Sequence, residues 1–552
     1  MAAFAWLASN AVTLLAPDLQ EACRRWADRP AITFGDSTIT YGELWHRVCS
    51  LAGAYRDLGV QRGDRVVCQL PNCPEQVLAV AAAWLAGAVH VGTDNDLTGA
   101  ELVGLADQVD ARAVVFQPRP GSPDPFGALR AVGEARPRTA LILHDPSPAP
   151  PGNGPGLEGM HRFENLVDRP VIEPAMAQSE DRTEIAVLLL TSGTTGRSKA
   201  VKESFTACWA KMQFFSDAYR PQPDDVHLVY LPMAHVFGFR LGLIALLTGG
   251  RLVLLDRFSP EAALRLVTDE QVTILPGMPT HLTLLLAALD PARHDVGSLR
   301  WAISAASQLP TPVAEGVYDR LGVDLLYVFG CAEGFTTRTT DRGEILRGSV
   351  GKTVFEGPRG TAQDGSVRVV DPADGRSLPV GEVGELAFGA RCPVEYWADP
   401  PTATDGWYRT GDLGRIDPDG CVFVVGRLKE LVNRGGLKVS PSEIETTILR
   451  HPAVLDAGVI GAPDPVLGEA ICACVVLADP DVADRGAAGR ETLDLAGLRS
   501  FVGLSLARHK LPDELCVVEV VPRTKIGKVD RPKLTAQVAG EDLPSERLRP
   551  DQ

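Results

Sequence analysis

The chain has 552 residues, an apolar content of 45% and a formal net charge of −16. A chain of this length is too long for one hydrophobic core, so we expect two or more domains. The acidic balance disfavours sequence-independent nucleic-acid binding and docking on an anionic membrane, because both need a basic surface.

The cysteines and the N-terminal sequence bear on whether the protein is secreted or cytoplasmic. Eleven cysteines are scattered along the chain without a CxxC pair, so their spacing predicts neither a zinc site nor a disulfide framework. The apolar N-terminus has no Lys or Arg before its apolar stretch, unlike a secretory signal. No run is long and apolar enough to predict a transmembrane helix. We therefore expect a cytoplasmic protein.

Strands and helices alternate in the first predicted block. The pattern predicts a strand over 65–70, a helix over 74–84, a strand over 87–91, a helix over 97–109 and a strand over 113–116. Thr98 and Glu101 have the spacing of a capping box at the start of the second helix. This βαβαβ series predicts an α/β fold with a parallel, doubly wound sheet.

A second α/β block follows a Pro/Gly loop over 145–157. Its predicted strands cover 185–190, 226–230, 251–255, 272–275, 301–304 and 325–329. Between 366 and 425 short strands alternate with turn signals, which predicts a small antiparallel sheet or a distorted barrel.

The last segment predicts a small α+β domain that begins at Gly426-Arg427. It has a helix over 441–451, capped by Ser440 or Ser442, and strands over 457–460 and 470–477. An acidic, Gly/Ala-rich stretch over 479–489 is typical of a surface loop.

Residues 191–199 read TSGTTGRSK and follow the apolar run 185–190. Gly193 and Gly196 lack Cβ atoms, so backbone N–H groups can approach an anion closely. The G-x-x-G-x-x-K spacing differs from that of the P-loop. Alone, the pattern is equally typical of a polar surface loop. The side chains that can bind phosphate are those of Ser192, Thr194, Thr195 and Lys199.

Two carboxylates stand beside predicted ligand positions. Asp412 follows a glycine in what we interpret as a tight turn, and it can accept hydrogen bonds from ribose hydroxyls. Glu333 follows a buried strand, where doubly wound folds bind ligands, and it can ligate Mg²⁺. Alone, each is also typical of a turn or surface acid.

Two basic side chains are further candidates. His235 follows a strand and can gate the site or donate near a reacting carboxylate, although a single His is more often structural. Lys528 follows Gly527 on a loop, where a lone lysine is normally a solvated charge.

Together these segments resemble the adenylate-forming superfamily, in its acyl-CoA and aryl-CoA synthetase branch. The resemblance extends from Tyr41 to Leu534. It implies a large AMP-binding domain over 1–426 and a mobile C-terminal lid over 427–552. A β subdomain forms the end of the large domain, over about 375–426. The matching segments are TSGTTGRSK at 191–199, FGCAEG at 329–334, YRTGDL at 408–413, GRLKELVNRGG at 426–436 and PRTKIGK at 522–528.

The family joins a carboxylic acid to a thiol in two half-reactions that use ATP, Mg²⁺ and coenzyme A. The acid attacks the α-phosphate of ATP to give an acyl-adenylate, and the thiol of CoA or of a carrier protein then attacks the adenylate. The lid rotates between the two steps. The resemblance implies that Lys528 bridges the acid and the α-phosphate, that Glu333 holds the metal, and that Lys429 is the hinge.

The remaining roles are also implied by the resemblance. His235 and Lys199 join Lys528 as catalytic residues. The ATP- and AMP-binding residues are Thr191, Ser192, Gly193, Thr194, Thr195, Gly196, Ala305, Phe329, Gly330, Cys331, Ala332, Asp412 and Arg427. The CoA tunnel is formed by Asn433, Arg434, Gly435 and Gly436.

The expected acid pocket consists of Val236, Phe237, Phe239, Gly277 and Phe335. Val236 stands where enzymes for 2-hydroxybenzoates carry Asn, which disfavours a salicylate-type acid. The aromatic side chains make the pocket apolar, and Gly277 is expected to leave volume. We therefore expect a bulky, largely apolar aromatic or alicyclic acid.

The chain departs from the family pattern at Ser198, Ala200, Phe205 and Ala305, all on the ATP side. One alternative is therefore a ligase specialised for thioesterification of a pre-formed acyl-adenylate. A second is a stand-alone acid-adenylating enzyme that loads a carrier protein. A third, of a different class, is a non-catalytic acyl-adenylate-binding protein. An amino-acid-activating domain is disfavoured because residues 237–239 contain no Asp.

Overall fold

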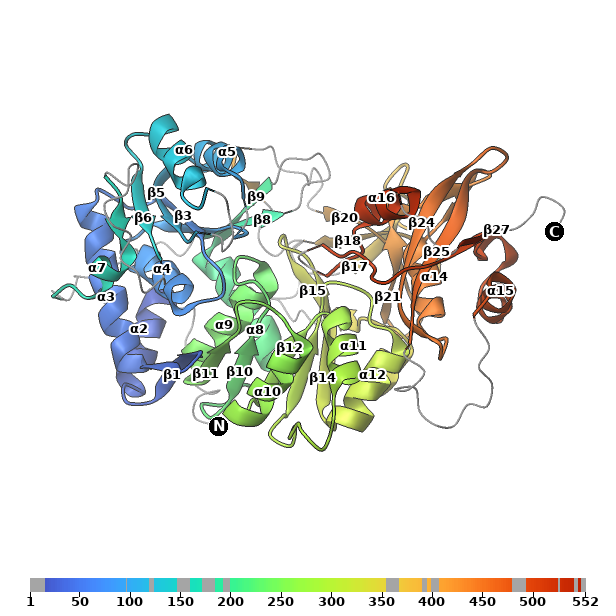
Figure 1. Cartoon of the computed structure of the whole chain (residues 1–552), viewed down its shortest axis with the longest axis horizontal. Coiled ribbons are helices and arrows are strands. Elements are labelled where there is room, and N and C mark those ends of the chain that lie inside the picture. The colour runs from blue at the N-terminus through green and yellow to red at the C-terminus, as the bar shows by residue number, and fades with distance from the viewer. Residues whose placement is uncertain are drawn as a thin grey trace.

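The structure is a computed structural model. It describes residues 15–95, 97–118, 124–145, 159–170, 184–191, 199–353, 367–389, 395–398, 407–478, 493–524, 527–540 and 545–547. A large body extends from the N-terminus into the yellow part of the chain, and a smaller orange and red body lies beside it (Figure 1). No helix in the described residues is long and apolar enough to cross a membrane.

The first large sheet of the described chain is parallel in its centre and antiparallel at both edges. In spatial order its strands are β16 (Lys352–Thr353), β15 (Phe335–Thr339), β14 (Asp324–Gly330), β13 (Trp301–Ser304), β12 (Ile274–Gly277), β10 (Val226–Val229), β11 (Arg251–Leu254), β1 (Pro30–Phe34) and β2 (Ser37–Thr40).

The second large sheet has the same plan, with a parallel centre and one antiparallel edge. In spatial order its strands are β19 (Glu395–Tyr396), β9 (Lys199–Ser204), β8 (Ile185–Thr191), β4 (Val89–Gly92), β3 (Arg65–Gln69), β5 (Ala111–Phe116), β6 (Ala140–Leu143) and β7 (His161–Arg162). These two sheets confirm the predicted α/β class.

Helices join the two sheets into one core. α4 (Pro74–Leu85) packs on β3 and β4, and α9 (Val236–Thr248) packs on β10 and β11. The two helices meet where the ring centroids of Trp84 and Phe239 lie 6.1 Å apart. The other helices of the large body are α2 (Leu15–Arg25), α3 (Tyr41–Asp57), α5 (Gly99–Val109), α6 (Gly127–Ala135), α7 (Phe163–Val167), α8 (Phe205–Tyr219), α10 (Pro260–Glu270), α11 (Pro279–Ala288), α12 (Thr311–Gly316) and α13 (Arg342–Leu346).

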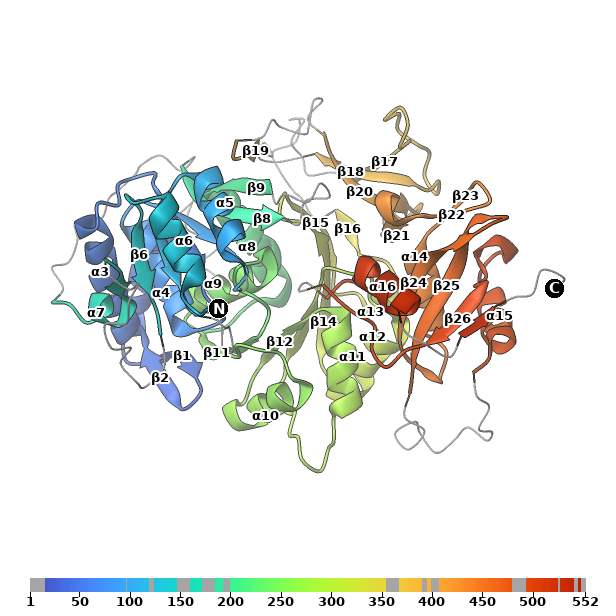
Figure 2. The ribbon, with the colours of Figure 1, turned by 45° about the horizontal axis from the view of Figure 1, so that its top comes forward.

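A small antiparallel sheet links the large body to the smaller one (Figure 2). Its strands are β17 (Val367–Val370), β18 (Gly384–Gly389), β20 (Trp407–Ile416) and β21 (Val422–Arg427). The smaller body has a mixed sheet and helices on it. Its elements are β22 (Val432–Arg434), β23 (Leu437–Val439), β24 (Val454–Asp464), β25 (Gly468–Leu477), β26 (Glu514–Val517), β27 (Ser545–Arg547), α14 (Pro441–Ile448), α15 (Leu495–Gly503) and α16 (Arg531–Gly540).

Three local expectations differ from the structure. Asp412 does not lie in a tight turn but inside β20, where Gly411 has a φ of 74° and the pairing with β18 shifts register. Ser440 precedes α14 without capping it, because its hydroxyl donates to the Val425 carbonyl (2.6 Å). Residues 199–204 form strand β9, which the sequence did not predict. The loops expected over 145–157 and 479–489 lie almost wholly outside the described residues.

A buried ion pair lies in the core between β9 and α9. Arg240 donates to both carboxylate oxygens of Glu203, at 2.7 and 2.6 Å, and both side chains are 0% exposed. Lys211 of α8 lies 3.3 Å from the same carboxylate. Burial opposes ionisation of Glu203, yet the charges of Arg240 and Lys211 hold its pKa below the usual value. The carboxylate is therefore charged and compensated inside the core.

Removal of Arg240 should be costly for this reason. Arg240→Met should lower the free energy of unfolding by about 3 kcal/mol, because Glu203 then stays buried with only Lys211 near it. The double variant with Glu203→Leu should recover most of that loss, since an apolar pair can replace a buried ion pair. Urea unfolding of the three proteins measures the difference. A double variant that is less stable than Arg240→Met would contradict this interpretation.

Candidate active site

The site begins at two paired strand residues of the small linking sheet. Asp412 of β20 and Arg427 of β21 are register partners, and the Arg427 Nε donates to Asp412 Oδ1 at 2.6 Å. Burial opposes the charge of the guanidinium, but Asp412 raises the pKa of Arg427 above its usual value. The pair thus presents one fixed carboxylate and one fixed cation where the small sheet meets the smaller body.

The loop before α16 brings Lys528 to this pair. A tight turn holds the loop, because the Gly527 N–H donates to the Thr524 carbonyl (2.8 Å) and the Thr524 N–H to the Lys528 carbonyl (2.7 Å). Gly527 has a φ of 70°, and a Cβ there would lie 2.8 Å from the sulfur of Met278. Met278 follows β12, so the turn of the smaller body rests directly on the large body.

Burial and neighbouring charges both act on Lys528. Burial lowers the pKa of the Lys528 ammonium below its usual value, and the neighbouring charge of Arg427 lowers it further. The carboxylates of Asp412 and Glu430 act in the opposite direction but do not cancel the effect. Two cations placed side by side in a part-buried site favour an anion between them.

Glu333 projects from a turn at the carboxyl end of β14. The Cys331 N–H donates to the Gly334 carbonyl at 2.7 Å, and the Gly334 N–H donates back at 3.1 Å. Burial, with the Glu333 charge beside it, holds the pKa of the Cys331 thiol well above its usual value. The nearby Asp412 carboxylate also raises the pKa of that thiol. Cys331 in turn lies close enough to Lys528 to influence the pKa of its ammonium. The structure therefore brings Glu333, Asp412, Arg427 and Lys528 together.

Tyr396 is a site residue that the sequence did not predict. Its hydroxyl donates to Glu333 Oε1 at 3.0 Å, and its ring centroid lies 5.0 Å from the Nζ of Lys199. It lies in the two-residue strand β19, paired with Val201 of β9. Tyr396 thus connects the end of the 191–199 loop to Glu333. An isolated Tyr in a short segment gives no sequence signal for this role.

Lys211 supports the Glu333 turn from the other side. Its Nζ donates to the Ala332 carbonyl at 3.1 Å while it pairs with Glu203. The buried ion pair of the core is therefore bonded directly to the residue before Glu333. Its members are far apart in sequence, and no motif marks them.

Glu333 meets the requirements for a Mg²⁺ ligand. Mg²⁺ sites beside phosphates need only one or two protein carboxylates, because water and phosphate oxygens supply the other ligands. Asp412 is engaged by Arg427, so Glu333 is the carboxylate of this group that lacks a cationic side chain among its hydrogen-bond partners in the described residues. One half-buried carboxylate oriented by a tyrosine fits such a site.

Only the ends of the 191–199 loop are described. Thr191 ends β8 and Lys199 begins β9, and these two residues are register partners. The Thr191 hydroxyl donates to the Lys199 carbonyl at 3.4 Å. Residues 192–198, with Ser192, Gly193, Thr194, Thr195, Gly196 and Ser198, lie outside the described residues. Ala200 and Ala305 are buried, and Phe205 begins α8.

His235 lies on the acid side of the expected site, at the start of α9. Its Nε2 is 3.0 Å from Asp94 Oδ1, and its backbone N–H donates to the Pro232 carbonyl. Asn72 supports the segment that leads to it, donating to Leu231 (3.0 Å) and accepting from the Met233 N–H (2.9 Å). The histidine is therefore held by partners from both large sheets.

Two expected pocket residues have other surroundings. Phe239 is 1% exposed, stacks on His90 and contacts Trp84, so it belongs to the core rather than to a pocket wall. Gly277 leaves no free volume in its Cβ direction, because a Cβ would lie 2.8 Å from the Tyr230 hydroxyl.

The surroundings of Val236 and Phe237 are also described. Phe237 stacks on Phe215 with ring centroids 6.1 Å apart, and Val236 is half-buried beside it. The side chain of Phe335 lies outside the described part of the structure.

The residues expected at the CoA tunnel form a hairpin in the smaller body. Asn433 and Arg434 lie in β22, and Gly435 and Gly436 form the turn with φ values of 58° and 86°. Arg434 pairs with Asp513 through two hydrogen bonds of 2.8 and 2.6 Å. Lys429 lies between β21 and β22, where the chain passes from one body to the other.

Comparisons with known proteins place the chain among AMP-binding enzymes. The AMP-binding enzyme family matches residues 19–394, and the AMP-binding enzyme C-terminal domain matches residues 443–528. The chain is 34% identical over 536 residues to a 2-hydroxy-7-methoxy-5-methyl-1-naphthoate–CoA ligase of Streptomyces carzinostaticus, covering 95% of this chain and 92% of that protein. It is 32% identical to a salicylyl-CoA synthase/salicylate adenylyltransferase of a Streptomyces species, covering 95% and 93%.

Solved structures show the same fold. ATP-bound MatB of Rhodopseudomonas palustris superposes with a TM-score of 0.78 at 28% identity, covering 95% of this chain and 99% of that one. The anthranilate CoA ligase AuaEII with anthranoyl-AMP gives a TM-score of 0.82 at 23% identity, covering 97% and 99%. The chain thus belongs to the AMP-binding enzyme family, and it is an acid–thiol ligase of the adenylate-forming superfamily.

Proposed function

We propose that the protein converts a bulky, largely apolar aromatic or alicyclic carboxylic acid to its CoA thioester through an acyl-adenylate. The observation that carries this proposal is the convergence of Lys528, Arg427, Asp412 and Glu333 where the two bodies meet. The relatives named as naphthoate and salicylate ligases support an aromatic acid.

The first half-reaction has an electrostatic obstacle that these residues address. A carboxylate must approach the α-phosphate of ATP although both are anions. Lys528 holds a positive charge in a part-buried position beside Arg427, where a cation stabilises developing negative charge more strongly than in water. The carboxylate of Asp412 accepts hydrogen bonds from the ribose hydroxyls, so the nucleotide is held in register for in-line attack.

A second group of residues binds the phosphates of ATP. Lys199 and the 191–199 loop bind the β- and γ-phosphates, beside the Tyr396–Glu333 hydrogen bond. Glu333 holds Mg²⁺, which when bound neutralises phosphate charge. His235, fixed by Asp94, closes the acid side of the site next to Val236 and Phe237.

The second half-reaction requires Lys528 to leave. The domains 1–426 and 427–552 rotate about Lys429, and the turn at Gly435 and Gly436 comes to line the path of the thiol. Both glycines lack a Cβ and have positive φ values, so the backbone can lie close to a pantetheine arm. The large body and the lid then alternate between two arrangements.

A ligase specialised for thioesterification is the second candidate. It is favoured by the departures at Ser198, Ala200, Phe205 and Ala305, all on the ATP side. A carrier-protein arm instead of CoA is a variant of the acceptor. The docked position of Lys528 favours the complete reaction, because this lysine serves adenylation alone.

Lys528→Ala should separate the two half-reactions. Acid-dependent ATP–pyrophosphate exchange should fall by about 100-fold or more, the range seen when one transition-state charge partner is removed. Thioester formation from a supplied acyl-adenylate should change little, since Lys528 is displaced in that step. Lys533→Ala is the matched control, because Lys533 is exposed and pairs only locally with Asp530. Equal losses in both assays would refute the assignment.

The lowered pKa of Lys528 predicts the pH dependence of adenylation. The ammonium must stay protonated to bridge two anions, so kcat/KM for adenylation should begin to fall at a lower pH than the ~10.4 of an ordinary lysine. Lys528→Arg should move that fall to higher pH, since a guanidinium stays protonated to about pH 12. A pH–rate profile that is identical for both proteins would show that another group titrates.

An acid library tests the substrate class and the second candidate together. Mass spectrometry of products made with ATP and CoA should show thioesters of bulky aromatic or alicyclic acids, because Val236 and Phe237 offer an apolar surface. An acyl-adenylate supplied directly is the parallel reaction. Thioesters from acetate-sized acids alone would contradict the proposed class. Product from the adenylate alone, without pyrophosphate exchange, would favour the thioesterification-only ligase.

A further inference from the structure

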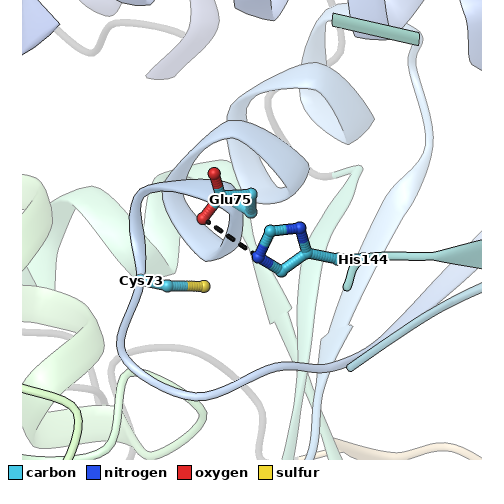
Figure 3. A group of neighbouring side chains, drawn as sticks. All are labelled: Cys73, Glu75 and His144. Carbon is cyan, nitrogen blue, oxygen red and sulfur yellow. Dashed lines mark ion pairs between the residues drawn. The ribbon is translucent and has the colours of Figure 1, made fainter. Parts of the chain in front are cut away.

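Three side chains of metal-ligating types converge beyond the carboxyl ends of β3 and β6 in the second large sheet. Cys73 follows β3 and immediately precedes α4, Glu75 lies in the first turn of α4, and His144 follows β6. Their ligand atoms, one sulfur, one oxygen and one nitrogen, all lie within 4.8 Å of one another. Figure 3 shows the imidazole facing both the carboxylate and the sulfur.

A contact between Nδ1 and Glu164 fixes the orientation of the His144 imidazole. His144 Nδ1 lies 2.8 Å from Glu164 Oε1, and the Asp145 N–H also donates to that oxygen (3.3 Å). Arg162 donates to the other oxygen of Glu164 at 3.2 Å. With its proton on Nδ1, His144 presents the lone pair of Nε2 to Glu75. A carboxylate behind the ligating histidine is the usual outer partner in zinc sites.

The distance between Nε2 and Glu75 matches two ligands of one ion. The two atoms are 3.5 Å apart. A direct charge-assisted hydrogen bond would place them at about 2.7–2.9 Å. Tetrahedral zinc with Zn–N and Zn–O bonds of about 2.0–2.2 Å separates its nitrogen and oxygen ligands by roughly 3.4 Å.

The donor set and the burial favour Zn²⁺ over a hard cation. Cys73 is 2% exposed and His144 is 7% exposed, so sulfur and imidazole are withdrawn from bulk water. Mg²⁺ and Ca²⁺ prefer oxygen ligands alone, whereas zinc binds sulfur, nitrogen and oxygen. A thiolate and a carboxylate also neutralise a divalent ion, and both lie at the start of α4, where the helix dipole stabilises negative charge.

We propose that Cys73, Glu75 and His144 form a Zn²⁺-binding site with one open position for water. The Glu75 side chain is 22% exposed, which gives that water and the ion access from solvent. Asn72, the neighbour of Cys73, bonds to Leu231 and Met233. A bound ion therefore also braces the segment that leads to His235. The spacing of cysteines could not reveal this site, because 71 positions separate Cys73 from His144 in the sequence.

The test is metal binding by the full-length protein after treatment with a chelator. Titration with Co²⁺ should give one equivalent bound, with the absorption of a thiolate–Co²⁺ bond, and Zn²⁺ should displace it. Zn²⁺ should also raise the melting temperature, because it binds only the folded chain. Cys73→Ala should abolish the thiolate band and weaken Zn²⁺ binding by at least about 100-fold, as expected for loss of a ligand.

Two further cysteine variants serve as controls. Cys331→Ala should keep the thiolate band, which excludes a sulfur donor beside Glu333. Cys49→Ala, also buried, should keep both the band and the Zn²⁺ affinity. If Cys73→Ala does not fold, Cys73→Ser takes its place, because a hydroxyl keeps the size of the side chain and gives no thiolate band.

Two outcomes would overturn the proposal. One is a wild-type protein that takes up no stoichiometric Co²⁺ or Zn²⁺ and whose melting temperature does not respond to either. The other is a thiolate band that persists in Cys73→Ala. Both readouts measure metal binding, so the result does not depend on the proposed ligase reaction.

Discussion

The organisation of this enzyme depends on one electrostatic constraint: two anions must be brought together for a bond to form. In the proposed reaction Lys528 meets this constraint, because it lies part-buried beside Arg427, where burial lowers the pKa of its ammonium. These cations come from separate elements, one from the small linking sheet and one from a loop of the smaller body.

One contact between the Lys528 loop and the large body is at Met278. It is made by a turn in which Gly527, at a φ of 70°, approaches Met278 without a side chain of its own. Backbone hydrogen bonds link Thr524 to Gly527 and to Lys528 within this loop. Side chains hold the same loop, because Arg523 donates to the Gly527 carbonyl (3.0 Å) and the Thr524 hydroxyl accepts from the Lys528 N–H (3.2 Å).

The elements that could be predicted from the sequence are those that local residue patterns determine. The α/β class, most strand positions and the capping box of Thr98 and Glu101 were all predictable, because they follow from local periodicity and capping rules. Asp412 was placed in a turn, since Gly411 looks like a turn residue, whereas the structure uses that glycine for an irregularity within β20.

Contacts between distant segments were not predictable. Tyr396 reaches Glu333 only because β19 pairs with β9 across almost two hundred residues, and a two-residue strand has no periodicity to detect. Gly277 was expected to open volume, but the Tyr230 hydroxyl from a neighbouring strand occupies that direction. Side-chain packing across a sheet is decided by tertiary register, which a single sequence does not encode in local patterns.

The Glu203–Arg240–Lys211 cluster has a consequence for redesign. Arg240 belongs to α9, the helix that begins after His235 and carries Val236 and Phe237, while Lys211 is bonded to the residue before Glu333. The wall that faces the acid and the turn that faces the metal therefore share one buried charge balance. Grafting α9 from a relative to change the acid would transplant half of an ion pair. If α9 and the Glu333 turn serve the acid and the metal as proposed, a change in one would disturb the ion pair that supports the other.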